Sequence, residues 1–235
     1  MEPWLIFIPF LLLIIAVAVW GAYAAAQRRK ELAAWCARRG FTFSADRDRS
    51  FMERYPNFDC FRKGDQDRYA YNIMTGRWGE RPLIAFDYHY ETVSTDSKGR
   101  RTTHSHHFSG VILHSALPLK PLFIRPEGFF DKVTEFFGHD DIDFESAEFS
   151  RKFYVRSPDR RWAYDVIHQR TMEFLLSQPT FTIEFDGPHA LAFRGGTFGV
   201  AEFEQAADVI AGVLDRLPDY LKKQLQPPEP PEYQK

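Results

Sequence analysis

An apolar stretch near the amino terminus, from Pro3 to Ala26, constrains this chain more than any other feature. It reads PWLIFIPFLLLIIAVAVWGAYAAA and contains no charged residue. At about 1.5 Å per residue, a helix of about 23 residues extends roughly 35 Å, enough to cross a hydrocarbon core of about 30 Å. A single segment in lipid satisfies its own backbone hydrogen bonds only as a helix. The sequence therefore predicts a transmembrane anchor over residues 1–26, which contacts the bilayer through residues 4–26.

A cleaved signal peptide is the main alternative for this stretch. Signal peptides have a basic amino-terminal region and a shorter apolar segment, whereas this chain begins Met1-Glu2-Pro3. The alanines before Gln27 resemble a cleavage site, so cleavage stays open as the less favoured alternative. A buried core helix is disfavoured because nothing polar interrupts the stretch.

Basic residues next to the anchor predict its orientation. Arg28, Arg29 and Lys30 follow the span directly. Because such residues stay in the cytoplasm, we expect a cytoplasmic domain on a single-pass anchor in the inner (cytoplasmic) membrane, with the N-terminus outside. Ala18 and Ala22 belong to a four-residue spacing of small residues that would let a second helix approach, which leaves a homo-oligomer open.

The composition of the chain after the anchor indicates three further regions. About 200 residues follow the anchor, enough for one domain with its own core. The formal net charge of −2 gives no reason to expect a nucleic-acid partner. Two cysteines are too few for a disulfide framework. We expect a basic juxtamembrane helix over residues 27–40, an α+β cytoplasmic domain over 41–224, and a disordered proline-rich tail over 225–235.

The domain is predicted to contain a mainly antiparallel sheet with helices on one face. Alternating polar and apolar residues indicate a central meander and three shorter strands; the segments are 68–75, 83–92, 106–115, 41–44, 122–125 and 153–156. Residues 180–185 and 190–194 are expected to form a hairpin, because Asp186-Gly187 between them is typical of a tight turn.

Helical spacing of apolar residues predicts the helices. The anchor continues to Arg39 and stops at Gly40, a residue that favours the left-handed conformation at helix ends. Residues 128–137 and 202–217 form two further helices, and Pro218 kinks or ends the second. Ser157 is placed as the N-cap of another helix.

The segment from Ile142 to Pro179 resembles an uncharacterised family of bacterial single-pass membrane proteins. The shared pattern is E-x-x-x-F-x-x-x-F-x-V, then S-x-D-x-x-x-A, then a leucine-rich helix with a methionine. The matching residues are Glu145, Phe149, Phe153, Val155, Ser157, Asp159, Ala163, Met172, Leu175 and Leu176. The resemblance implies a membrane-tethered cytoplasmic domain of unknown function and supplies no catalytic residue.

Catalytic patterns are absent from the sequence. The chain contains no phosphate-binding loop, no H-E-x-x-H, no G-x-S-x-G and no C-x-x-C. We therefore expect neither an enzyme nor a bound cofactor, and an unrecognised hydrolase is the least favoured alternative.

Three clusters of polar residues are weak candidates for binding sites. His104 and His106 are expected on one face of a strand, with His89 opposite and His107 nearby, where imidazoles could hold Zn²⁺ or Cu²⁺. The acidic segment 139–145 is a weaker candidate for Ca²⁺ or Mg²⁺. Basic residues in two turns, Lys98, Arg100 and Arg101 with Arg77 and Arg81, could form one surface that faces the membrane or an acidic partner.

Two functions remain after this search. The favoured one is a membrane-tethered, non-enzymatic interaction or scaffold domain with an unidentified protein partner. The alternative is a metal- or ligand-sensing domain that uses His89, His104, His106 and His107. Elemental analysis of the purified domain would separate them.

Overall fold

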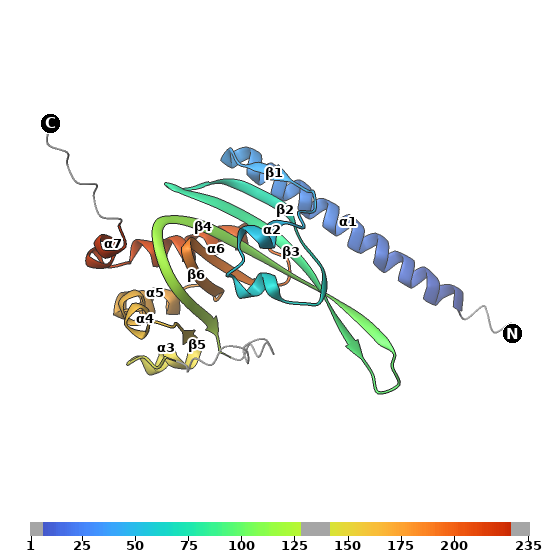
Figure 1. The fold of residues 1–235 in the computed structure, drawn as a ribbon. Coiled ribbons are helices and arrows are strands. Elements are labelled where there is room, and N and C mark those ends of the chain that lie inside the picture. Colours follow the sequence, from blue (N-terminus) through green and yellow to red (C-terminus); the bar gives the residue numbers. More distant parts are fainter. Residues whose placement is uncertain (1–6, 128–141, 227–235) are drawn as a thin grey trace.

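The computed structural model describes residues 7–127 and 142–226 of the chain, and the elements below belong to these ranges (Figure 1). The elements are α1 (Phe7–Arg39), β1 (Thr42–Ser44), α2 (Phe51–Arg54), the 3-10 helix η2 (Asp59–Arg62), β2 (Gln66–Trp78), β3 (Arg81–Thr95), β4 (Arg101–Pro126), α3 (Ala147–Lys152), β5 (Phe153–Arg156), α4 (Arg160–Val166), α5 (Gln169–Ser177), β6 (Thr182–Gly195), α6 (Val200–Asp215) and α7 (Asp219–Leu225). The helix expected at 128–137, the start of the acidic segment 139–145 and nearly all of the tail 225–235 lie outside the described residues.

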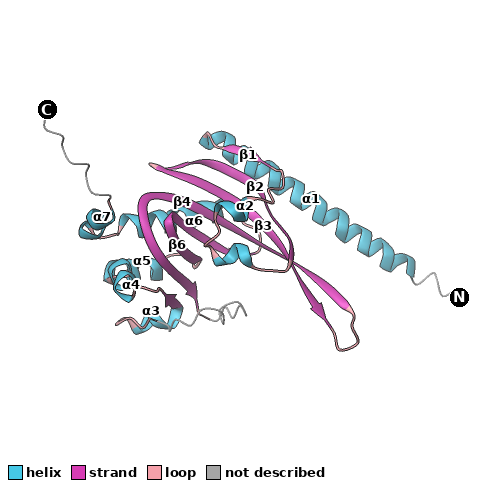
Figure 2. Ribbon diagram, viewed as in Figure 1, coloured by secondary structure: helices cyan, strands magenta, loops and turns pink. Residues whose placement is uncertain are grey.

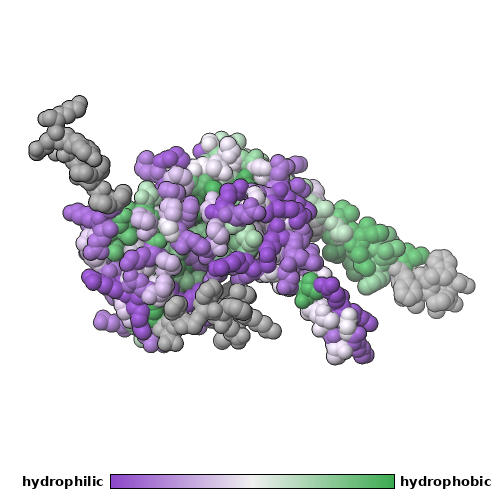
Figure 3. Space-filling view, viewed as in Figure 1, coloured by the Kyte–Doolittle hydropathy of each residue, from purple (hydrophilic) through white to green (hydrophobic). Residues whose placement is uncertain are grey.

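Helix α1 is continuous and has two halves with different surroundings. Residues 8–25 are exposed and apolar, and they extend from the domain as the green rod of Figure 3. In the second half, Leu32, Trp35 and Cys36 form a buried stripe against the domain. The helix is long and apolar enough to cross a membrane. It ends at Gly40, whose φ of +69° confirms the expected stop.

The sheet is antiparallel and follows the order β1-β2-β3-β4-β5, with β6 paired to β4 (Figure 2). The predicted meander is confirmed as β2, β3 and β4, and the predicted strands at 41–44 and 153–156 correspond to β1 and β5. Strand β4 is long enough to pair with β3 through its first half and with β5 through its end. It lies at the centre of the sheet.

The hairpin expected around Asp186-Gly187 is wrong. Strand β6 runs through both residues and pairs with β4 on each side of them, from Phe108↔Gly195 to Ile124↔Ile183. Gly187 has a φ of +52°, and the register shifts where it faces β4. The extra residues of this irregularity lie in β4, and the positive φ of Gly187 lets β6 bend and continue, because pairing with β4 is available along both halves.

Two apolar clusters lie on opposite faces of the sheet. Helices α1 and α6 pack on one face, where Trp35 of α1 stacks on Phe203 of α6 with ring centroids 6.4 Å apart. The opposite face is covered by α2 and η2, whose Phe51 and Phe61 pack on Phe86 of β3. This arrangement confirms the α+β class and adds short helices on the second face.

Helix boundaries after β5 differ from the expected ones. Asp159 is the N-cap of α4, since its side chain accepts a hydrogen bond from the Trp162 amide. Ser157, the expected cap, instead donates from Oγ to the Pro121 carbonyl. Pro218 ends the long carboxyl-terminal helix as expected and caps the short α7.

Candidate functional site

The junction between α1 and the sheet contains a buried ion pair. Arg28, the first basic residue after the apolar segment, donates from Nη1 and Nη2 to the two carboxylate oxygens of Asp87 at 2.7 and 2.8 Å. Its Nε donates to the Phe198 carbonyl at 2.7 Å. Asp87 lies in the middle of β3 and is fully buried. A bidentate guanidinium–carboxylate pair fixes orientation as well as distance, so the helix and the sheet are held together at this point.

Two further side chains complete the hydrogen bonds of the Asp87 carboxylate. Asn72 donates from Nδ2 at 2.7 Å, and Ser109 donates from Oγ. Ser109 Oγ also accepts from the Phe198 amide at 2.9 Å. Every charge at the junction is therefore paired and hydrogen-bonded, which is the condition under which a buried charge is tolerated.

Two bulges in β2 direct polar side chains toward this face. The register between β2 and β3 shifts after Gln66 and again after Tyr71. Asp67 and Asn72 lie at the shifts, and each has a φ of +48°. Asp and Asn are the residues other than glycine that most readily adopt positive φ. Without the bulge at Asn72, strict alternation would not bring its amide to Asp87.

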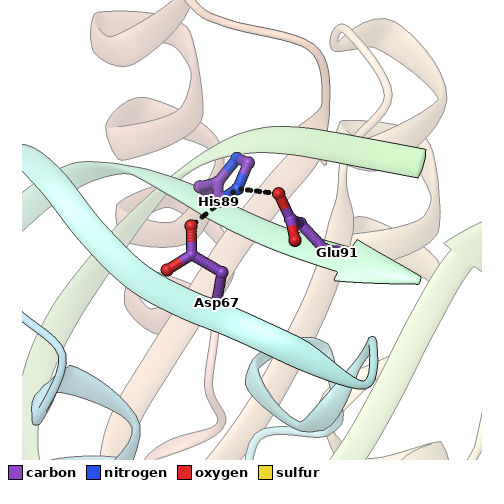
Figure 4. Close-up of side chains that lie close together, drawn as sticks. All are labelled: Asp67, His89 and Glu91. Carbon is purple, nitrogen blue, oxygen red and sulfur yellow. Dashed lines mark ion pairs between the residues drawn. The ribbon is translucent and has the colours of Figure 1, made fainter. Parts of the chain in front are cut away.

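A cluster of three titratable residues lies next to the junction, nearer the β3–β4 turn (Figure 4). His89 Nε2 lies 3.5 Å from Asp67 Oδ2 and 3.7 Å from Glu91 Oε1. The three potential ligand atoms lie within 4.8 Å of one another. Arg49 Nη1 pairs with Asp67 Oδ1 at 2.7 Å and competes with a cation for that carboxylate.

His89 is buried between two aromatic rings. Nδ1 has no hydrogen-bond partner within residues 7–127 and 142–226. The ring lies between Tyr69 and His107, with centroids 4.7 Å from each. Burial and the neighbouring His89 lower the pKa of His107. Metal-binding histidines normally donate through the second nitrogen, so the cluster lacks that support.

The histidines proposed from the sequence do not form one group. His107 pairs directly with His89, so these two share the face of Asp87. His104 and His106 are on the other face of β4, where His106 stacks on Tyr90 with centroids 4.9 Å apart. The expected common face for His89, His104 and His106 is therefore wrong. His107, the partner of His89, is one position from His106 and three from His104, and an odd step along a strand changes the face.

The two basic turns lie at opposite ends of β3 and do not form one surface. Arg77 and Arg81 flank the β2–β3 turn, where Arg81 pairs with Asp215 at 2.6 Å. Lys98, Arg100 and Arg101 belong to the β3–β4 turn and are exposed. That turn is the tip of a two-stranded ribbon, residues 92–104, which projects beyond the other strands (Figure 1).

The ribbon and the exposed half of α1 leave the domain at the same end. Arg28, at the start of the half of α1 that packs on the domain, is bonded to Asp87 of β3. Phe41, just past the end of the helix, packs over Gly76 of β2, which pairs with Leu83 of β3. Helix residues before Arg28 therefore continue in the direction in which β3 leads to the ribbon. Figure 1 shows both projections on one side of the domain.

Sequence reasoning missed the junction. The sequence pattern identifies Arg28 only as part of a basic flank and gives no partner for it. The available signal was a carboxylate within the apolar strand LIAFDYHY, which needs a buried partner. Chemically, the junction fixes the domain to a helix.

Comparisons with known proteins give one informative likeness. No protein-family model and no curated protein matches the chain. Among solved structures, the fold is similar to the crystal structure of the mycobacterial trehalose monomycolate transport factor A, TtfA. The TM-score is 0.58 at 14% sequence identity, and the match covers 86% of this chain and 98% of that chain. The likeness shows that the two chains share an α+β fold over nearly their whole lengths.

Proposed function

We propose that this chain is a membrane-anchored, non-enzymatic accessory factor of a transport process, whose domain binds a partner at the cytoplasmic face of the inner membrane. The observation that supports this most is the docking of α1 on the sheet through Arg28 and Asp87. A flexible linker would let a tethered domain turn freely. Here one continuous helix fixes both the position and the orientation of the domain relative to the apolar segment.

The fold likeness supports the choice of transport as the process. TtfA is by its title a transport factor, and the likeness covers 86% of this chain and 98% of that chain. The basic residues that follow the span, Arg28, Arg29 and Lys30, support the cytoplasmic placement. An impermeant maleimide should react with a cysteine at position 80, in the exposed β2–β3 turn, only after the cells are opened.

A flexible insertion tests whether fixed orientation matters. About six Gly and Ser residues placed between Ala26 and Gln27 leave the Arg28–Asp87 pair intact but free the domain from the span. We expect in-cell crosslinking and purification of the full-length protein to recover an integral membrane partner, and the insertion to reduce that recovery at least fivefold. The same insertion after Gln226 is the control and should change nothing. Recovery of no partner, or turnover of a substrate by the purified protein, would contradict the proposal.

A second function, metal sensing, has one observation in its favour. Asp67, His89 and Glu91 offer three ligand atoms close together, a mixed set that suits Zn²⁺ or Mn²⁺. Titration of the purified protein with Zn²⁺ should then show binding that His89→Ala removes. His104→Ala is the matched control because His104 lies on the other face. Equal binding by both variants would rule this cluster out as the site.

A further inference from the structure

A cavity of about 400 Å³ lies on the sheet face opposite α1. Its walls include aromatic rings from β4, β6 and the residue just before β6: Phe108, Phe123, Phe193 and Phe181. This volume is in the range of sites that hold one small molecule. Cationic side chains lie among the rings: Arg194 lies over Phe181 at 5.1 Å from the ring centroid, and Lys63 lies over Phe193 at 5.8 Å.

A buried carboxyl group lines the same cavity. Glu184 of β6 is only 5% exposed, and its Oε2 accepts a hydrogen bond from the Asp59 amide at 3.0 Å. Its Oε1 has no hydrogen-bond partner in the part of the chain that the structure describes. A second cavity of about 420 Å³ shares Glu184 as a lining residue. Leaving a buried polar atom unpaired is unfavourable, so this oxygen is available to a ligand.

A change in the alternation of β6 around Gly187 brings Glu184 to this cavity. After Gly187, Leu191 and Phe193 belong to the apolar cluster on this face, whereas before it Ile183 and Phe185 belong to the opposite cluster. The shift by one position turns the even-numbered residue Glu184 toward the face of odd-numbered Phe193. A straight strand would bury Glu184 under the helices.

The protonation state of the Glu184 carboxyl group determines which kind of ligand atom it would bind. Burial, followed by the nearby Asp59 carboxylate, raises the pKa of Glu184 to about 8. At neutral pH the group is therefore mostly a neutral acid. Because Oε2 already accepts from an amide, the proton belongs on Oε1, where it can be donated. A donor in an aromatic cavity with cations around it suits a ligand oxygen attached to an apolar chain.

We propose that this cavity binds a single-chain acyl amphiphile, with Glu184 donating a hydrogen bond from Oε1 to a carbonyl or carboxylate oxygen of its head and the phenylalanine rings enclosing its chain. This deepens the proposed function, on which it rests for its membrane context, by naming the class of molecule that the domain holds. A free fatty acid and a monoacyl ester share this chemistry, and the experiment separates them.

Photolabelling in membranes that contain the full-length protein tests the proposal. The probes are a diazirine-bearing palmitic acid and a diazirine-bearing monopalmitoylglycerol, and labelled peptides are located by mass spectrometry. We expect labels within residues 118–126 and 181–195, with the better probe identifying the head group. Labelling should fall as the pH rises from 7 to 9, because the raised pKa of Glu184 makes it lose its proton in that interval.

Variants at position 184 distinguish a hydrogen-bond donor from a mere filler of space. Glu184→Leu should reduce labelling about tenfold, the loss expected for one buried hydrogen bond. Glu184→Gln keeps a donor and should retain labelling without the dependence on pH. Glu148→Leu, at an exposed position of α3, is the control. Labels confined to α1, or no pH dependence in the unmodified protein, would overturn the proposal. Partner recovery in the insertion experiment is measured separately, so either proposal can fail alone.

Discussion

The guanidinium of Arg28 donates hydrogen bonds to both carboxylate oxygens of Asp87. The two residues are 59 positions apart in the chain. Asp87 has no exposure to solvent, and Arg28 retains 20% of its side-chain exposure. The pair joins the first helical turn after the apolar span to the middle of the central meander. As a result, the apolar helix and the sheet are joined as one structural unit.

Replacing Arg28 with alanine should destabilise the domain. The substitution leaves the Asp87 carboxylate buried without its cation, and breaking a buried pair costs about 3–5 kcal/mol. Since Arg28 is partly exposed, we expect the lower end, about 3 kcal/mol. Thermal unfolding of the full-length protein in detergent, followed by near-ultraviolet circular dichroism, measures this. Arg29→Ala changes an exposed neighbour and should stay within about 0.5 kcal/mol of the original. Equal stability of both variants would show that the pair contributes little.

Ser109 should contribute to the stability of the domain although it carries no charge. Its Oγ donates to Asp87 and accepts from the Phe198 amide, so Ser109→Ala leaves that amide unpaired at a buried position. We expect a loss of about 1–3 kcal/mol in the free energy of unfolding. Ser105→Ala, at an exposed position on the same strand, should be neutral. The double variant with Arg28→Ala should lose less than the sum of the two single losses, since both residues contact Asp87.

Gly76 should resist substitution for a steric reason. A Cβ added there would lie 2.1 Å from the Phe41 ring, which also packs edge-on against Trp35 at 5.3 Å. Gly76→Ala must displace the ring, and overpacking of this kind costs about 1–3 kcal/mol. Gly195→Ala is a matched control in another strand, since nothing lies within 4 Å of its added Cβ. Chemical denaturation of both variants compares them, and a neutral Gly76→Ala would mean that Phe41 moves freely.

The elements that the sequence predicted well are those set by local patterns. The apolar stretch, the stop at Gly40 and the alternation in β2, β3 and β4 each arise within a few residues. The central meander could be expected because consecutive strands pair through short turns. The short helices of segment 51–62 have too few residues for a periodic signal, and their packing on Phe86 is visible only in the fold.

The remaining features depend on pairing between distant segments. The continuity of β6 through Gly187 is decided by β4, which the local turn signal at Asp186-Gly187 could not reveal. The separation of His89 from His104 and His106 is set by register, where one position changes the face. The bulge at Asn72 also depends on pairing between strands, since only the fold shows that the Asn72 side-chain amide reaches Asp87.

Glu184 should make stability depend on pH. Its pKa is about 8 in the folded protein, against an ordinary carboxyl value of 4.5. The folded state therefore holds a proton that the unfolded chain has released, so the stability contribution is fully present below the unfolded value and is lost as the pH rises toward 8. The slope is at most about 1.4 kcal/mol per pH unit. Denaturation between pH 5.5 and 7.5 should show a smaller slope for Glu184→Gln than for Glu148→Gln, and identical slopes would contradict the buried acid.

The β3–β4 ribbon should lie at the lipid surface when the anchor is inserted. At about 3.4 Å per residue, β3 extends about 27 Å beyond Asp87 toward the end at which α1 leaves the domain. Its tip carries Lys98, Arg100 and Arg101, which anionic headgroups attract. Both native cysteines are buried, so a fluorophore can be placed selectively at Ser97→Cys. In proteoliposomes with anionic lipid, brominated lipids should quench this label but not one at Glu80→Cys, in the turn at the other end of β3. Reversing the three charges should relieve the quenching, and equal quenching at both positions would show that the ribbon does not define the membrane-facing end.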